Sequence, residues 1–300
     1  MGKLSMRFRS LGMAFSKAST PDENNLLLIR MMAATFVLLG HSFVLAPLSG
    51  GMGDPFLRLT HYVSSHILGV QIFFLISGFL VTASWDRRAN LKGFLAARLL
   101  RLWPGLAACV LTTVFLMGPW VTQLKVDDYL ISDKTLSYAF WNISLMGFEN
   151  ELPGVRFNPG LHGSEVNGGL WTISLESRLY LGVAVFGMIG LFRRPIFGIP
   201  ILGALTVVLV TEGFSLMKST QDGSGYLLAA FFTLGSLLYL VRHWIRLSWL
   251  WALVLILLSY LSRDTPYHQI SSALFASYAV FVLGFGPKIP LPIWLEDYSY

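Results

Sequence analysis

Charged side chains are scarce in this chain. Only 13% of its 300 residues are Asp, Glu, Lys or Arg, whereas 54% are hydrophobic. A soluble globular domain carries about 25% charged residues, and the mean hydropathy of this chain is +0.62. The chain therefore has too little polar surface for a soluble globule of its length, and its composition places it in a membrane.

Cysteine is almost absent as well. The single cysteine, Cys109, lies inside a predicted helix, so an intrachain disulfide is excluded and a metal cluster is not expected. We also find no internal repeat, no low-complexity tract and no soluble domain. The net charge of +6 is explained by basic residues facing anionic lipid at the inner leaflet, so no nucleic-acid partner is expected.

Long apolar runs are what the chain has instead. A membrane span needs roughly 20 mostly apolar residues, and this scale predicts an all-α, polytopic transmembrane bundle of about eight complete spans. The predicted spans lie near 26–48, 66–85, 94–120, 170–192, 195–212, 225–243, 247–262 and 269–286. The first run is too long for a cleaved signal peptide and is followed by further spans, so we expect it to be a permanent helix.

Lysine and arginine are distributed unevenly between the two sides of these spans. With a cytoplasmic N-terminus, fifteen of the 22 lie on the inner side and six on the outer side, and Arg178 lies within a helix. The positive-inside rule therefore predicts that the N-terminus is cytoplasmic. Residues 1–25 are expected to form a cytoplasmic tail, and residues 26–300 the membrane-embedded domain.

One connection is much longer than the others. Residues 121–169 form an outer-side segment, and connections of this length are usually functional or disordered. Its middle, Thr135 to Phe148, is too short and too polar to span, so we expect it to lie at the interface or to re-enter. This segment carries Asp127, Asp128, Trp141, Asn142 and His162.

The first span, LLLIRMMAATFVLLGHSFVL, carries two ionisable side chains, Arg30 and His41. Eleven positions at about 100° each come within about 20° of three full turns, so both side chains project from one helix face about 16 Å apart. Arg30 can be an anchor at the inner interface, and His41 can be a packing hydrogen bond. An intramembrane ionisable residue that faces a bundle is, however, a candidate functional residue.

Two further polar clusters stand in predicted spans. FLAARLLRLWPG places Arg98 and Arg101 three residues apart near the cytoplasmic end of the third span, where paired guanidiniums suit phosphate binding or serve as a basic flank. NGGLWTISLESRLYLG places Glu176 roughly 9 Å below the outer surface by the helix rise, at about the depth of His41. Glu176 can therefore orient the His41 imidazole, or it can form a structural ion pair with Arg178 or another basic residue.

The joint pattern of these motifs resembles the acyltransferase 3 family of integral-membrane O-acyltransferases. The motifs are R-x10-H in the first span, FFLISGF in the second, R-x-x-R in the third, GGLWTISLE in the fourth and DYSY at the end. Taken alone, Ser77 and Gly78 of FFLISGF indicate close helix packing. The resemblance covers residues 24 to 300 and implies about ten spans, an acyl-CoA donor and a carbohydrate hydroxyl acceptor. The chain stops inside the last motif, so we expect the domain to be incomplete at its C-terminus.

The resemblance also implies roles for individual residues. His41 is then the essential histidine, Arg30 its paired basic residue, and Arg98 and Arg101 the arginine pair of the third span. Combined with the geometry, this predicts that Arg30, Arg98 and Arg101 bind the nucleotide and phosphates of acyl-CoA, with acetyl-CoA as the expected donor and no metal. His41, assisted by Glu176, would act as general base or carry an acyl-histidine intermediate.

The resemblance implies a surface glycan or lipid-linked sugar as acceptor and a bacterial inner membrane as location. The outer segment would then face the acceptor, since sugars are commonly bound by aromatic faces and carboxylates; its candidate residues are Asp127, Asp128, Trp141, Asn142 and His162. A proton-coupled transporter or flippase that uses His41, Glu176 and Arg178 is the rival from another class. Its paired broken helices in two related halves are not seen in the sequence. A non-catalytic membrane partner is the third alternative.

Overall fold

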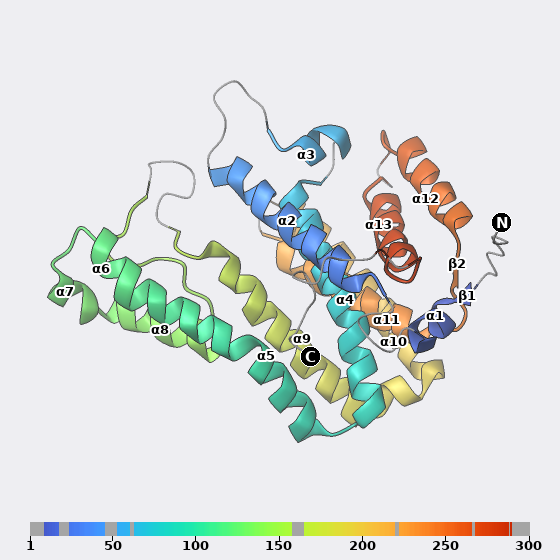
Figure 1. Ribbon diagram of the computed structural model, residues 1–300, viewed down its shortest axis with the longest axis horizontal. Helices are drawn as coiled ribbons and strands as arrows, with labels where there is room; N and C mark the ends of the chain where they lie inside the picture. Colours follow the sequence, from blue (N-terminus) through green and yellow to red (C-terminus); the bar gives the residue numbers. More distant parts are fainter. Residues whose placement is uncertain are drawn as a thin grey trace. The chain divides into compact units, whose positions relative to one another are not determined.

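The computed structural model describes residues 9–17, 24–45, 53–60, 63–157, 165–219, 222–265, 268–287 and 289. His162 lies outside these ranges. The described residues form an all-α fold, as predicted, with one departure: Arg9–Ser10 (β1) pairs antiparallel with Arg246–Leu247 (β2) (Figure 1).

The helices match the predicted spans in position more closely than in length. Four are long and apolar enough to cross a membrane: Leu26–Leu45 (α2), Ser65–Arg88 (α4), the continuous run Leu91–Val121, and Pro195–Met217, which belongs to α10 (Pro195–Lys218). Three shorter apolar helices are Ser224–Leu240 (α11), Trp249–Leu261 (α12) and Ile270–Gly284, which belongs to α13 (His268–Gly284). Helix α9 (Trp171–Met188) occupies the remaining predicted position. The chain is thus a polytopic helical membrane protein, and the number of complete spans stays a prediction.

The chain divides into two compact units. The first comprises residues 1–80, 198–208 and 230–300, and the second comprises residues 81–197 and 209–229. Helices α4, α10 and α11 contribute residues to both units.

The N-terminal segment is built into the core of the first unit. Helix α1 (Leu11–Lys17) places Phe15 edge-on to Phe79, Tyr239 and Phe285, with ring centres 5.1, 6.2 and 6.1 Å away. Such edge-to-face pairs stabilise beyond their buried area. The strand pair brings Ser10 opposite Arg246 and Arg9 opposite Leu247, so two segments that the positive-inside rule assigns to one side of the membrane lie together.

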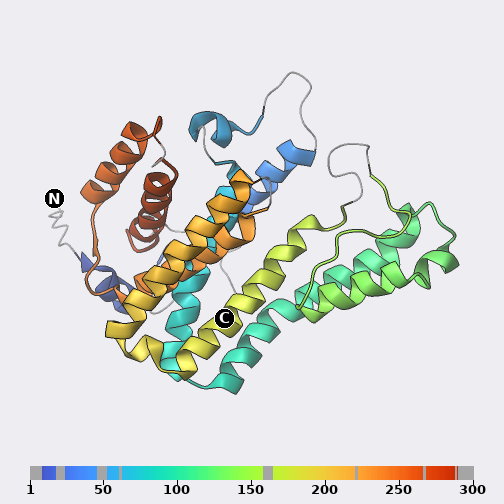
Figure 2. The same ribbon diagram turned by 180° about the vertical axis from the view of Figure 1, so that it is seen from behind.

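Two helix pairs complete the first unit. Helices α12 and α13 pack side by side as a hairpin in both views (Figure 2). Helix α4 packs against α11, where Ser236 Oγ donates to the carbonyl oxygen of Gly78 at 3.3 Å. This contact confirms the expected close packing at the ISG sequence of the second span.

The second unit is organised around a long interrupted helix. Residues Leu91–Thr112 (α5) continue through a π-helical turn, Thr113–Met117 (η2), into Gly118–Val121 (α6). The predicted outer segment then folds as Val126–Leu130 (α7) and Asp133–Ser144 (α8), and η3 (Gly168–Leu170), α9 and η4 (Leu191–Arg193) follow. Helix α5 packs against both α8 and α9.

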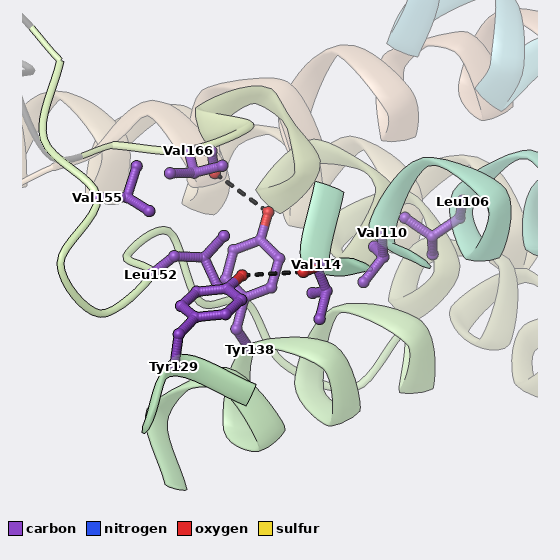
Figure 3. Packing of buried hydrophobic residues seen from close by; sticks show 8 residues of the cluster. All are labelled: Leu106, Val110, Val114, Tyr129, Tyr138, Leu152, Val155 and Val166. Carbon is purple, nitrogen blue, oxygen red and sulfur yellow. Dashed lines mark hydrogen bonds between the residues drawn. The ribbon is translucent and has the colours of Figure 1, made fainter. Parts of the chain in front are cut away.

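The outer segment packs against α5 and η2 in a hydrophobic cluster around two fully buried tyrosines, Tyr129 and Tyr138 (Figure 3). Tyr129 Oη donates to the carbonyl oxygen of Val114 at 3.1 Å, and Tyr138 Oη donates to that of Val166 at 3.4 Å. Val114 lies in the π-helical turn, so a side chain from the outer segment satisfies that carbonyl. Burial raises the pKa of Tyr138 to about 12. Residues 121–157 are therefore a packed module and not a loose loop.

Gly118 makes this packing possible. A Cβ atom at this position would lie 1.9 Å from Tyr129 Oη, so Gly118→Ala is expected to displace the hydroxyl and leave the Val114 carbonyl unsatisfied. We expect this change to lower the free energy of unfolding by about 1–3 kcal/mol, measured as thermal unfolding in detergent. Gly105→Ala is the matched control, because nothing lies within 4 Å of a Cβ there. Equal losses in the two variants would contradict this explanation.

Candidate active site

His41 lies near the C-terminal end of α2 and is half-buried. Its Nδ1 lies 2.8 Å from the carbonyl oxygen of Val37, one turn earlier. Because a carbonyl only accepts hydrogen bonds, this contact assigns the proton to Nδ1 and leaves a lone pair on Nε2. In the neutral imidazole, Nε2 is therefore the nitrogen that can take up a proton.

A second imidazole lies beside His41. The ring centre of His66, in the first turn of α4, is 4.9 Å from that of His41, with the two planes tilted by 59°. The helices approach closely here because residue 40 is glycine: a Cβ atom at Gly40 would lie 2.4 Å from the backbone nitrogen of His66. The sequence analysis missed His66. Like His41, it is an ionisable residue within a predicted span, and that was the signal that could have identified it.

The buried carboxylate of Asp54 fixes the start of α4. Asp54 Oδ1 accepts from the backbone nitrogens of Phe56 and Leu57 at 2.8 and 3.4 Å and so caps α3 (Pro55–Thr60). Its Oδ2 accepts from Ser65 N at 2.6 Å and Ser65 Oγ at 2.7 Å. A single carboxylate thus satisfies donors at two helix N-termini, where negative charge is favourable.

The hydrogen bonds of Asp54 predict a pH dependence of stability. Burial raises the pKa of Asp54, but the hydrogen bonds from Ser65, Phe56 and Leu57 outweigh it and bring the pKa below 3.8. A carboxyl with a lowered pKa contributes stability above pH 3.8 and loses it as the pH falls through the folded-state pKa. Asp54→Ala is expected to cost about 0.5–2 kcal/mol near neutral pH, and the difference from wild type should shrink below about pH 4. The exposed Asp127→Asn is the control, and a difference that stays constant with pH would contradict the assignment.

Arg98 occupies the centre of a second polar cluster, in the second unit. Its guanidinium lies 5.8 Å from the ring centres of both Phe94 and Tyr180. One terminal nitrogen donates to Ser84 Oγ at 3.2 Å, whereas the buried Nε has no hydrogen-bond partner in the part of the chain that the structure describes. Arg98 is therefore held by Ser84 and two aromatic rings, with one donor left unpaired among the described residues.

Tyr180 connects Arg98 to Glu176. Its hydroxyl donates to the Glu176 carboxylate one turn earlier on α9, while its ring faces the Arg98 guanidinium. The sequence analysis placed Arg98 near the cytoplasmic end of its span and Glu176 in the outer half. Arg98 lies about 10 Å from the start of α5, and Tyr180 lies near the middle of α9. Tyr180 can therefore contact Arg98 through its ring and Glu176 through its hydroxyl, although the two charged residues were predicted at different depths.

The remaining predicted residues occupy different surroundings. Arg101 is exposed on α5, and Arg30 is half-buried on α2, the helix that also carries His41. Arg178 is exposed and donates to the carbonyl oxygen of Met146 at 2.7 Å, so it helps to hold the outer segment. The meeting of His41 with Glu176 stays a prediction, since they belong to different compact units.

A cavity of about 360 Å³ opens beside the Arg98 cluster. It lies where α4 ends and α5 begins and is lined by Ser84, Trp85, Arg88, Ala89, Asn90, Gly93, Phe94 and Ala97. Arg88 places a guanidinium in this lining, and Asn90 caps α5 by accepting from Gly93 N at 3.2 Å. The sequence analysis counted Arg88 only as an inner-side cation. The cavity combines the Arg88 guanidinium with the N-terminus of α5, which suits an anionic ligand, and Arg98 adjoins it through its hydrogen bond to Ser84.

The basic connections of the second unit lie at this same end. A Cβ atom at Gly187, near the end of α9, would lie 2.0 Å from Trp85 Nε1, near the end of α4. The connection after Arg87 and Arg88 and the one that contains Arg193 and Arg194 therefore emerge together, as the predicted topology requires.

Three curated proteins show partial similarity to the chain. The first is "O-acetyl transferase" of Shigella phage Sf6, 33% identical over 52% of this chain and 44% of that protein. The second is "Nodulation protein 10" of Rhizobium leguminosarum bv. viciae, 29% identical over 59% of this chain and 47% of that protein. The third is "Regulator of hypoxia-inducible factor 1" of Caenorhabditis elegans, 27% identical over 52% of this chain and 30% of that protein.

The chain thus spans less than half the length of each of these relatives, and no solved structure matches it. The acyltransferase domain model, by contrast, matches residues 23–294, which include both polar clusters. The chain therefore belongs to the acyltransferase 3 family.

Proposed function

We propose that this protein is a membrane-bound O-acyltransferase that moves an acyl group, acetyl in the first instance, from acyl-CoA to a hydroxyl of a surface glycan or lipid-linked sugar. The observation that carries the proposal is the state of His41, whose Nδ1 donates to the Val37 carbonyl and whose Nε2 is left basic. Family membership supports the reaction class, and the "O-acetyl transferase" relative supports acetyl as the group transferred.

The proposed reaction begins at His41 Nε2. The nitrogen takes the proton of the acceptor hydroxyl while the oxygen attacks the thioester carbonyl carbon. The new C–O bond forms, the C–S bond breaks with its electron pair on sulfur, and the thiolate takes up the proton and leaves as free CoA thiol. General-base catalysis of this kind typically contributes about 10²–10⁴ in rate.

The donor would bind through the Arg98 cluster. The phosphates of acyl-CoA are anionic, and arginine binds phosphate through its planar fork of N–H donors. Arg98 has an unused buried donor, and Arg88 and the N-terminus of α5 border the adjacent cavity. Arg101, which is exposed, and Arg30, which is half-buried, would contribute positive charge to donor binding.

Glu176 has a more specific place in this proposal than in the sequence analysis. Its carboxylate accepts a hydrogen bond from Tyr180, whose ring faces Arg98. Glu176 can therefore orient Tyr180 and, through it, the Arg98 guanidinium. Its predicted assistance to His41 is retained as part of the proposal, because a carboxylate that reaches an imidazole raises its basicity.

The acceptor would bind at the outer segment. Trp120 and Trp141 are 92% and 40% exposed, and Asp127 and Asp128 are exposed beside them in sequence. Flat aromatic faces and carboxylates suit sugar rings. Asn142 no longer belongs to this set, because it is buried and its side chain donates to the carbonyl oxygens of Tyr138 and Glu149 at 2.9 and 2.8 Å.

Transfer of a labelled acyl group tests the proposal. The purified protein in lipid nanodiscs is incubated with [14C]acetyl-CoA and a bacterial inner-membrane extract that contains lipid-linked glycans. The proposal predicts label on carbohydrate and an equal release of free thiol. Release of thiol without labelled carbohydrate would contradict the glycan acceptor, and proton flux in liposomes without any transfer would favour the transporter alternative.

A further inference from the structure

We propose that His66 is a positioning residue of the acyl-transfer site that shares the proton taken up by His41. This inference rests on the proposed function and concerns a residue that lies outside the R-x10-H pattern. Its basis is the pair of adjacent imidazoles and the way the surrounding structure holds them, all within the first compact unit.

The distance between the two rings permits direct contact. Their centres are 4.9 Å apart and their planes are tilted by 59°. In this resting arrangement His66 Nδ1 accepts no hydrogen bond from His41, and the proposed N–H···N bond of about 2.7–3.2 Å forms only when His41 gains a second N–H. The two rings reach this arrangement from different helices, α2 and α4, at the point where Gly40 lets the helices approach. A side chain at position 40 would separate them.

The hydrogen bonding of His66 is incomplete. Its Nε2 lies 3.5 Å from Ser64 Oγ, whereas its Nδ1 is buried and has no hydrogen-bond partner among the described residues. A buried polar atom without a partner is costly, so its retention needs an explanation. If Nε2–H donates to Ser64, Nδ1 carries a lone pair that can accept a hydrogen bond from a neighbouring N–H.

His41 gains such an N–H only during the reaction. In the resting state its Nδ1–H is directed to Val37 and its Nε2 is unprotonated. When Nε2 takes the proton of the acceptor hydroxyl, the new N–H lies between the acceptor oxygen and His66 Nδ1, and the two accept it together in a bifurcated hydrogen bond. The proton then rests on the histidine pair until the CoA thiolate takes it, so atoms and charges balance.

This timing makes the contact catalytic in effect. An interaction that exists only when His41 is protonated stabilises the transition state and not the ground state, so it raises kcat and leaves substrate affinity unchanged. Asp54 supports the arrangement, because its bonds to Ser65 N and Oγ fix the residue immediately before His66.

Two conservative substitutions of His66 separate this role from a packing role. In asparagine a polar atom occupies the place of histidine Nδ1, whereas in glutamine it occupies the place of Nε2. His66→Asn is therefore expected to retain kcat within about threefold. His66→Gln and His66→Leu should lose about 10- to 100-fold in kcat with an unchanged KM for acetyl-CoA, as expected for a lost hydrogen bond to a charged group. Ser42→Ala is the control, since Ser42 Oγ bonds its own helix at Leu39 O.

The outcomes are distinct from those that test the proposed function. Wild-type protein that transfers no label would refute the function itself. Wild-type protein that transfers label while His66→Gln matches it in kcat would overturn the role of His66 alone. So would equal kcat losses in the asparagine and glutamine variants.

A measurement on the unmodified protein covers the case in which the variants fail to fold. Nitrogen-15 NMR of histidine-labelled protein is expected to show an unprotonated Nδ1 at His66 and an unprotonated Nε2 at His41. A protonated Nδ1 at His66 would overturn the proposal, because that nitrogen could then accept nothing.

Discussion

Removing the Arg98 guanidinium is expected to weaken acyl-CoA binding by about 10- to 100-fold, because hydrogen bonds to charged groups contribute about 1.5–3 kcal/mol. Arg98→Lys keeps the charge but loses the fork, so its loss should be smaller. Arg88→Ala should weaken binding less than Arg98→Ala, and adding Arg101→Ala to Arg98→Ala should increase the loss only slightly, since Arg101 is exposed. Equilibrium binding of acetyl-CoA to purified protein at low and high salt measures these effects.

The controls for this prediction come from the same chain. Arg58→Ala removes an exposed arginine on α3 and should leave donor affinity unchanged. Because Arg98 packs against Phe94 and Tyr180, thermal unfolding of each variant shows whether the fold is intact. The exposed Arg88 keeps the test informative if Arg98→Ala unfolds. Wild-type donor affinity in both the Arg98→Ala and Arg88→Ala variants would refute the assignment of the donor site.

Hydropathy predicted the fold class and the positions of the helices because long apolar segments must satisfy their backbone groups internally. It predicted lengths less well. Helix α12 has 13 residues and α11 has 17. Leu247, which was predicted to begin the span of α12, belongs to β2 instead, and the polar residues Arg242 and His243 follow the end of α11. The strand pair of Arg9 with Leu247 was not predictable, since two residues carry no period and the partners are far apart in the sequence.

The outer segment shows what hydropathy cannot detect. Its core depends on Tyr129 and Tyr138 reaching carbonyls at Val114 and Val166, which are contacts between residues 15 and 28 positions apart. No local pattern encodes such contacts. Asn142 was therefore proposed as a sugar ligand from its residue type, although its side chain is fully used inside the module.

The sequence indicated which ionisable residues are candidates for the site, but it did not indicate which side chains lie next to them. Helix periodicity placed Arg30 and His41 on one face because a single helix has a fixed geometry. The neighbours His66 and Tyr180 come from other helices, and tertiary packing alone brings them to His41 and Arg98. The tautomer of His41 also required the structure, since it depends on one hydrogen bond to Val37.

Replacing His41 with glutamine is expected to reduce acyl transfer by at least about 10²-fold while leaving acyl-CoA affinity within about twofold. Glutamine can form hydrogen bonds in a packing role but cannot take up a proton at neutral pH, and the loss of a general base is expressed in kcat. His41→Ala should show the same loss. A packing histidine would instead be rescued by glutamine, and its loss in the alanine variant would appear as a lowered unfolding temperature.

The most direct test of His41 as the base of an acyl transfer is a side-by-side assay of wild-type protein and the His41→Gln variant, both shown beforehand to bind acetyl-CoA equally. Label on carbohydrate and free CoA thiol are measured in the same samples. We predict that wild-type protein produces both in equal amounts and that the variant produces neither above background. Transfer by the His41→Gln variant at the wild-type rate would contradict the account.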